Sequence, residues 1–131
     1  MKLLLDTNAY SALRRGHEIV AERVRSSDEV FLSVVVVGEL LFGFRHGSRF
    51  EENALALESF LEDPNVRLLP VTWNTADRFG LISAALRKKG RPIPTNDIWI
   101  AAQALETGAN LISSDPHFGH IDGLPWVAFP T

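Results

Sequence analysis

Short apolar segments alternate with longer segments of helical periodicity along the whole chain, and this alternation limits the possible folds more than any other feature. Strands that alternate with helices predict an α/β fold with a mainly parallel sheet. A chain of 131 residues with 46% hydrophobic residues suits a single domain over residues 1–131. The expected strands are residues 2–5, 30–32, 66–69, 110–113 and 126–129, and the expected helices are residues 9–15, 17–25, 33–44, 51–61, 72–89 and 96–106.

Residues 33–44 can be interpreted in two ways. Four consecutive valines at 34–37 favour a strand by intrinsic propensity. A helix capped by Ser33 would instead place Val36, Leu40 and Phe44 on one apolar face. A short strand has no need of that spacing, so we expect a helix.

Helix ends are marked by residues that favour caps. Residues 6–8 are Asp-Thr-Asn, all strong N-caps for the helix that follows. Thr72 is expected to cap a helix that ends at Gly90, and Thr95 to cap the helix 96–106. Residues 115–119 are expected to be irregular.

Two carboxylates directly follow expected strands. Asp6 comes after Leu5, and Asp115 follows the serines at the end of residues 110–113. Ligands of open parallel sheets bind outside the carboxyl ends of the strands, where these two acids could be neighbours. Each also has an ordinary alternative role, as a helix cap or as the first residue of a turn.

Glu39 lies among apolar or small neighbours on the expected helix 33–44, so its face of that helix should be buried. A carboxylate removed from water must be paired, protonated or bound to a cation. The structural alternative is a salt bridge to an arginine such as Arg45 or Arg14. The sequence therefore makes Glu39 a candidate site residue.

Asp97 lies in the first turn of the expected helix 96–106, where the helix dipole favours an acid regardless of function. Its axial neighbours Ile100 and Ala101 belong to the inward side of that helix. The preceding residues 92–96 look suited to hold the helix start at a fixed position. We therefore favour a functional role for Asp97.

Four converging acids cannot all stay ionised without a cation. Oxygen ligands suit Mg²⁺ or Mn²⁺, the ions used to hydrolyse phosphodiesters. Zinc is less favoured because the chain has no cysteine and its histidines are scattered, with His117-x-x-His120 a weak exception.

Charge and composition exclude several other classes. The formal net charge of −3 does not indicate broad, non-specific nucleic-acid binding, so basic contacts would have to be local, as at Arg14–Arg15. Such clusters are equally explained as solvated helix ends. The absence of cysteine is compatible with a reducing, cytoplasmic location. The apolar residues before Asp6 are too few for a signal peptide or a membrane span.

Four motifs in this order resemble the PIN domain, and specifically a VapC-like toxin. The resemblance spans nearly the whole chain. Its motifs are Leu5-Asp6-Thr7-Asn8, Ser33-(five residues)-Glu39-Leu40-(two residues)-Gly43, Thr95-Asn96-Asp97-(three residues)-Ala101-Ala102, and Ser114-Asp115 before Phe118.

The resemblance implies a three-layer α/β/α fold and an Mg²⁺- or Mn²⁺-dependent endoribonuclease that acts on RNA. It also implies a cognate antitoxin that blocks the site, and a homodimer, for which residues 51–61 and 76–83 offer candidate surfaces. By the family pattern, the metal ligands and catalytic residues are Asp6, Glu39, Asp97 and Asp115, and the supporting polar groups are Thr7, Asn8, Asn96 and Ser114. The pattern departs at His117, where many relatives carry a further acid, so a second metal site is not implied.

Two alternatives stay open at this point. A PIN-like nuclease of DNA or of RNA maturation would use the same acids. A non-catalytic receiver-like signalling module also has an acidic pocket at strand ends, but it needs a lysine after a late strand. The only lysines here are Lys2, Lys88 and Lys89, none of which follows residues 110–113.

Overall fold

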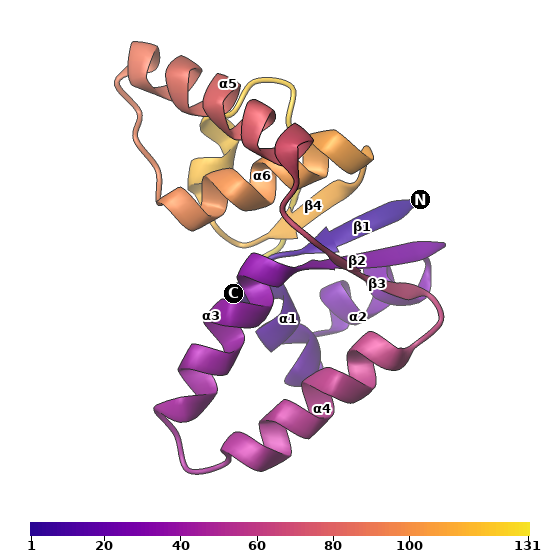
Figure 1. Cartoon of the computed structure of the whole chain (residues 1–131). Helices are drawn as coiled ribbons and strands as arrows, with labels where there is room; N and C mark the ends of the chain where they lie inside the picture. Colours follow the sequence, from indigo (N-terminus) through magenta and orange to yellow (C-terminus); the bar gives the residue numbers. More distant parts are fainter.

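A five-stranded parallel sheet forms the centre of the computed structural model, which describes residues 1–131 (Figure 1). The strand order is β3-β2-β1-β4-β5, and every neighbouring pair is parallel. The predicted α/β class with a parallel sheet is therefore confirmed. The strands are β1 (Lys2–Leu5), β2 (Glu29–Ser33), β3 (Val66–Leu69), β4 (Asn110–Ser113) and β5 (Trp126–Ala128).

Six α-helices cover both faces of the sheet and complete three layers. The first four helices lie on one side of the sheet and α5 and α6 on the other (Figure 1). None of them combines the length and the apolar composition needed to span a membrane. The helices are α1 (Thr7–Arg14), α2 (Glu18–Arg25), α3 (Val34–Arg45), α4 (Phe50–Glu62), α5 (Trp73–Lys89) and α6 (Thr95–Thr107), with a 3-10 helix η1 (Pro116–His120) after β4.

The valine-rich segment forms a helix, as its periodicity predicts. Strand β2 ends at Ser33, whose side chain caps α3 by accepting a hydrogen bond of 3.0 Å from the backbone N–H of Val35. Val36 and Leu40 are buried and Phe44 is half-buried. Packing of this apolar face therefore overrides the strand propensity of the valines.

The predicted ends of α5 are confirmed, the predicted cap of α6 is wrong, and a segment predicted to be irregular forms a short helix. Thr72 caps α5 in a capping box with Thr75, and Gly90 ends it at φ +65°. The cap of α6 is Pro94 and not Thr95, because the Pro94 carbonyl already accepts from the backbone N–H of Asp97. The segment expected to be irregular forms η1, whose first turn is held by a side chain of Asp115.

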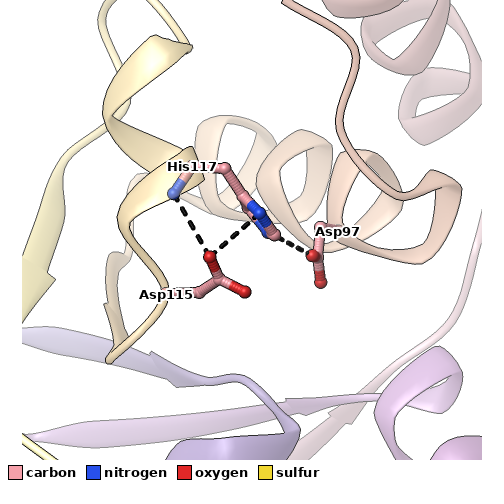
Figure 2. Close-up of side chains that lie close together, drawn as sticks. All are labelled: Asp97, Asp115 and His117. Carbon is pink, nitrogen blue, oxygen red and sulfur yellow. Dashed lines mark hydrogen bonds and ion pairs between the residues drawn. The ribbon is translucent and has the colours of Figure 1, made fainter.

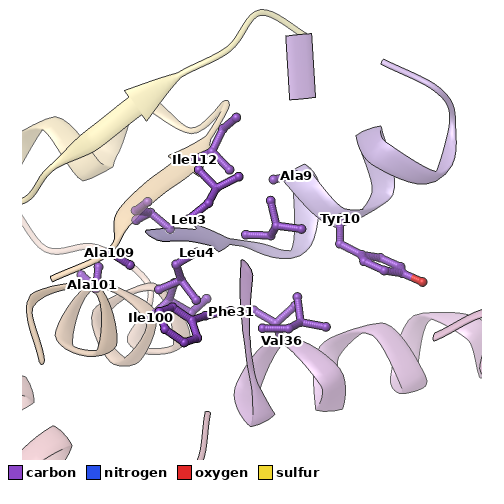
Figure 3. Close-up of a cluster of buried hydrophobic side chains, with 14 of the residues drawn as sticks. Leu3, Leu4, Ala9, Tyr10, Phe31, Val36, Ile100, Ala101, Ala109 and Ile112 are labelled. Carbon is purple, nitrogen blue, oxygen red and sulfur yellow. The ribbon is translucent and has the colours of Figure 1, made fainter. Parts of the chain in front are cut away.

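The core lies on both faces of β1, whose leucines are fully buried. Leu4 and Phe31 are register partners and so point to the same face, where they meet Ile100 of α6 (Figure 3). On the other face, α1 packs against β4, with Ala9 close to Ile112 (Figure 3). Both layers of helices thus pack on the central strand β1. This packing fixes the position of Asp6, the residue that follows β1.

Successive strands are added first on one side of β1 and then on the other, so the strand order changes direction between β1 and β4. Connections from β1 run through β2 to β3, and the chain then crosses to β4 on the opposite side of β1. Ligands of open α/β sheets bind outside the carboxyl ends of strands at such a switch point. Asp6 follows β1 and Asp115 comes shortly after β4, so both acids lie at this place.

Candidate active site

A cavity of about 430 Å³ lies at the carboxyl ends of β1 and β4 and contains all four predicted acids. No basic side chain lines it, so the charge of these carboxylates is not neutralised by an arginine or lysine. This composition fits a cation as ligand. The lining residues are Asp6, Thr7, Asn8, Glu39, Pro94, Thr95, Asn96, Asp97 and Asp115.

Asp6 is the most buried of the four acids, with 4% of its surface exposed. One carboxylate oxygen caps α1 by accepting a hydrogen bond of 2.8 Å from the backbone N–H of Ala9, and the other accepts from the Ser113 hydroxyl. Burial, with smaller contributions from the charges of Asp97 and Asp115, raises the pKa of Asp6 to about 6 in spite of the lowering effect of these two hydrogen bonds. A cation in the cavity would favour its ionised form.

Glu39 reaches the cavity from α3 and is held by neutral donors. The Thr7 hydroxyl donates a hydrogen bond of 2.6 Å to Oε1, and the Asn96 amide donates one of 3.3 Å to Oε2. No salt bridge forms to Glu39, which removes the alternative of an arginine partner. The prediction that this face of α3 is buried was wrong: Glu39 is half-buried and the neighbouring Phe42 is 68% exposed, because that part of α3 borders the open cavity and solvent.

Asp97 and Asp115 face each other across the ring of His117 (Figure 2). His117 Nε2 lies 2.6 Å from Asp97 Oδ2, and Nδ1 lies 2.9 Å from Asp115 Oδ1. Burial raises the pKa of Asp97, the contact with His117 lowers it, and the charges of Asp115 and Glu39 raise it. The sequence marked His117 only as half of a weak histidine pair and as a departure from the family pattern. Its contacts with Asp97 and Asp115 were not predicted, because the direction of its ring depends on the 3-10 helix.

Three of the four predicted supporting residues line the cavity, and the fourth does not. Thr7, Asn8 and Asn96 are lining residues, whereas Ser114 is not. The serine that contacts Asp6 is Ser113. The pairing of β1 with β4 explains this contact, since Leu5 is opposite Ile112 and the next residues are therefore Asp6 and Ser113.

A comparison with protein families covers the segments that form this cavity. The model of the PIN domain matches residues 3–124, which contain every lining residue of the cavity. The chain belongs to the PIN domain family. Its four acids reach one cavity from four separate segments of this PIN domain: the end of β1, α3, the first turn of α6 and the turn after β4.

This PIN domain is similar in sequence and in structure to proteins named VapC and VapBC. The protein is 34% identical over 131 residues to Ribonuclease VapC1 of Haemophilus influenzae (strain R2866), with 96% of each chain covered. Among solved structures, VapBC-1 from nontypeable Haemophilus influenzae is 31% identical with a TM-score of 0.86, covering 98% of both chains. VapBC-5 from Mycobacterium tuberculosis, a member of the VapBC family of toxin–antitoxin systems, is 25% identical with a TM-score of 0.74, covering 99% of this chain and 98% of that one.

Proposed function

We propose that this protein is a metal-dependent endoribonuclease that hydrolyses RNA phosphodiesters and serves as the toxin of a toxin–antitoxin pair. The observation that carries the proposal is the cavity in which four carboxylates meet with no arginine or lysine in its lining. The similarity to proteins named Ribonuclease VapC supports RNA as the substrate. The similarity to a structure described as part of a toxin–antitoxin system supports an antitoxin as partner.

Asp6, Glu39, Asp97 and Asp115 are the proposed ligands of Mg²⁺ or Mn²⁺. The donor set fits such an ion, since it consists of oxygens on side chains that already have fixed positions. When bound, the ion supplies the positive charge that polarises the phosphodiester and makes water a better nucleophile.

The neutral side chains of the site hold the acids in place. Thr7 and Asn96 occupy both oxygens of Glu39, so this carboxylate keeps one orientation. Ser113 and the start of α1 do the same for Asp6. Preorganised acids need little rearrangement when substrate arrives, which is the main contribution a protein makes to such a site.

RNA cleavage by the purified, antitoxin-free chain is the first test. Total cellular RNA is incubated with Mn²⁺ or Mg²⁺, and parallel reactions contain a chelator or the Asp97→Asn variant. We expect discrete fragments that disappear in both parallel reactions. Asp77→Asn is the matched control, because Asp77 is an exposed acid of α5 outside the cavity.

Cleavage that resists the chelator would overturn the metal-dependent mechanism. Fragments from DNA but not from RNA would favour the alternative of a DNA nuclease with the same acids. A receiver-like signalling role is disfavoured because no lysine lines the cavity.

Three further properties are part of the proposal. Residues 1–131 constitute one domain, since all five strands join one sheet and the buried hydrophobic residues form one cluster. The protein acts on cellular RNA, so we place it in the cytoplasm.

It forms a homodimer through apolar surface that includes Leu55 of α4 or Leu81 of α5, both of which are exposed. Light scattering that gives a single-chain mass at all concentrations would contradict the dimer.

A further inference from the structure

His117 occupies the space between two of the proposed metal ligands. Its two ring nitrogens contact Asp97 and Asp115, one carboxylate on each side of the ring (Figure 2). Atoms of these three residues that could bind a metal all lie within 4.8 Å of one another. The imidazole is therefore close enough to share a cation with the carboxylates.

The position of the ring is fixed by its backbone. The backbone N–H of His117 donates a hydrogen bond of 3.2 Å to Asp115 Oδ1, which closes the turn that starts η1. The next residue, Phe118, is 1% exposed and anchors the turn in the core. His117 itself keeps a quarter of its side chain exposed toward solvent. Its ring is thus directed at the acids by the fold.

The two nitrogens of His117 have different neighbours. Asp115 accepts from Nδ1 when that atom carries the proton, and a carboxylate in this place commonly orients a metal-ligating histidine. The lone pair of Nε2 then faces Asp97 Oδ2 at 2.6 Å. In this arrangement His117 Nε2 and Asp97 Oδ2 are close enough to bind one cation together.

We propose that His117 binds the cation of the site through Nε2 and makes the site prefer Mn²⁺ over Mg²⁺. The inference rests on the proposed function, because it concerns the same cation. Mg²⁺ favours a shell made only of oxygens, whereas Mn²⁺ is a transition-metal ion, the first of the divalent series that binds mixed nitrogen and oxygen sites. The nitrogen ligand is thus the feature that separates the two ions.

His120 is the matched control because it belongs to the same short helix but faces another region. It lines a separate, mostly apolar cavity with residues of α5, and its carbonyl accepts a hydrogen bond from Lys89. A His120→Asn variant therefore removes an imidazole of η1 without touching the acids.

Pulsed electron paramagnetic resonance of Mn²⁺ added to the full-length protein tests the ligand directly. We expect a ¹⁴N coupling from imidazole in the wild type and in His120→Asn, and no such coupling in His117→Gln. Calorimetric titrations with Mn²⁺ and Mg²⁺ give the preference. His117→Gln should weaken Mn²⁺ binding about tenfold and Mg²⁺ binding less, and His117→Asp should shift the preference toward Mg²⁺.

The outcomes separate this inference from the proposed function. Mn²⁺ that binds the wild type without imidazole coupling, and with the same preference in His117→Gln, would refute the role of His117 and leave the carboxylate site intact. No Mn²⁺ or Mg²⁺ binding by the wild type would refute both. The spectrum of the wild type needs no substitution, so an unstable variant would not prevent a decision.

Discussion

Thr7 Oγ1 donates a hydrogen bond of 2.6 Å to Glu39 Oε1 and thereby joins the first residue of α1 to the middle of α3. The other oxygen of Glu39 is held by Asn96 at the start of α6. Three helices that surround the cavity are thus connected through one carboxylate. Because both donors are neutral, they orient Glu39 and leave its negative charge available.

Replacing Thr7 with valine should lower activity with little change in fold. Valine has nearly the same shape but cannot donate to Glu39, so the carboxylate loses one of its two orienting hydrogen bonds. We expect a loss of roughly tenfold or more in RNA cleavage and in Mn²⁺ affinity. Thr7→Ser keeps the hydroxyl and should stay close to the wild type. Equal losses in the two variants would show that the hydrogen bond is not what matters.

Ser113 should matter more than Ser114 for catalysis. Ser113 donates to the buried carboxylate of Asp6, and this hydrogen bond lowers the pKa of Asp6. Ser113→Ala should reduce cleavage about tenfold at neutral pH and shift the lower limb of the pH–rate profile upward. Ser114→Ala should have the smaller effect, because Ser114 does not line the cavity. The opposite ranking of the two serines would contradict this assignment.

Asp6 should make the metal-free protein less stable at neutral pH than in mild acid. Burial raises its pKa to about 6 from an ordinary value of 3.8, so the folded state holds this proton more tightly than the unfolded chain does. The free energy of unfolding therefore falls as the pH rises from about 4 to about 6, by about 3 kcal/mol at most, and stays reduced above that range.

An Asp6→Asn variant tests this pH dependence. Asparagine can still cap α1 and hydrogen bond with Ser113, but it carries no charge. Urea denaturation with a chelator should find the variant more stable than the wild type at pH 7.5 and similar to it at pH 4. The variant should be inactive toward RNA. If both proteins show the same change in stability between these two pH values, Asp6 is not its source.

Thr75 should affect stability but not activity. Its buried hydroxyl accepts from the backbone N–H of Thr72 and donates a hydrogen bond of 2.6 Å to Glu106 of α6. Thr75→Val leaves these groups without their partner and should cost about 1–3 kcal/mol in urea denaturation. Cleavage at 25 °C should not change, since Thr75 does not line the cavity. A large loss of activity in folded protein would contradict this separation.

Local patterns in the sequence were enough for most of the secondary structure and for naming four acids that line one cavity. Strands 66–69 and 110–113 match β3 and β4, and Ser33 caps α3 as expected. These features depend on residues that are close in the chain, such as an apolar face of helical spacing or a polar residue before a helix.

Features that depend on distant segments could not be predicted from local patterns. The contact of Ser113 with Asp6 requires the register between β1 and β4, and periodicity says nothing about register. The ring of His117 meets Asp97 only because η1 turns it toward α6. The N-cap of α6 is Pro94 instead of Thr95 because the Pro94 carbonyl accepts the first hydrogen bond of the helix, which intrinsic propensities do not predict.

The pairing of β1 with β4 brings together Asp6 and Ser113, which are 107 residues apart in the chain. During translation, the nascent protein therefore holds Asp6 and Glu39 long before the ribosome adds the strand that completes their surroundings. Fragments that end before β4 lack Asp115 and cannot assemble the cavity. The full set of four acids therefore exists only once β4 and the turn after it have been made, so the proposed activity belongs to the nearly full-length chain.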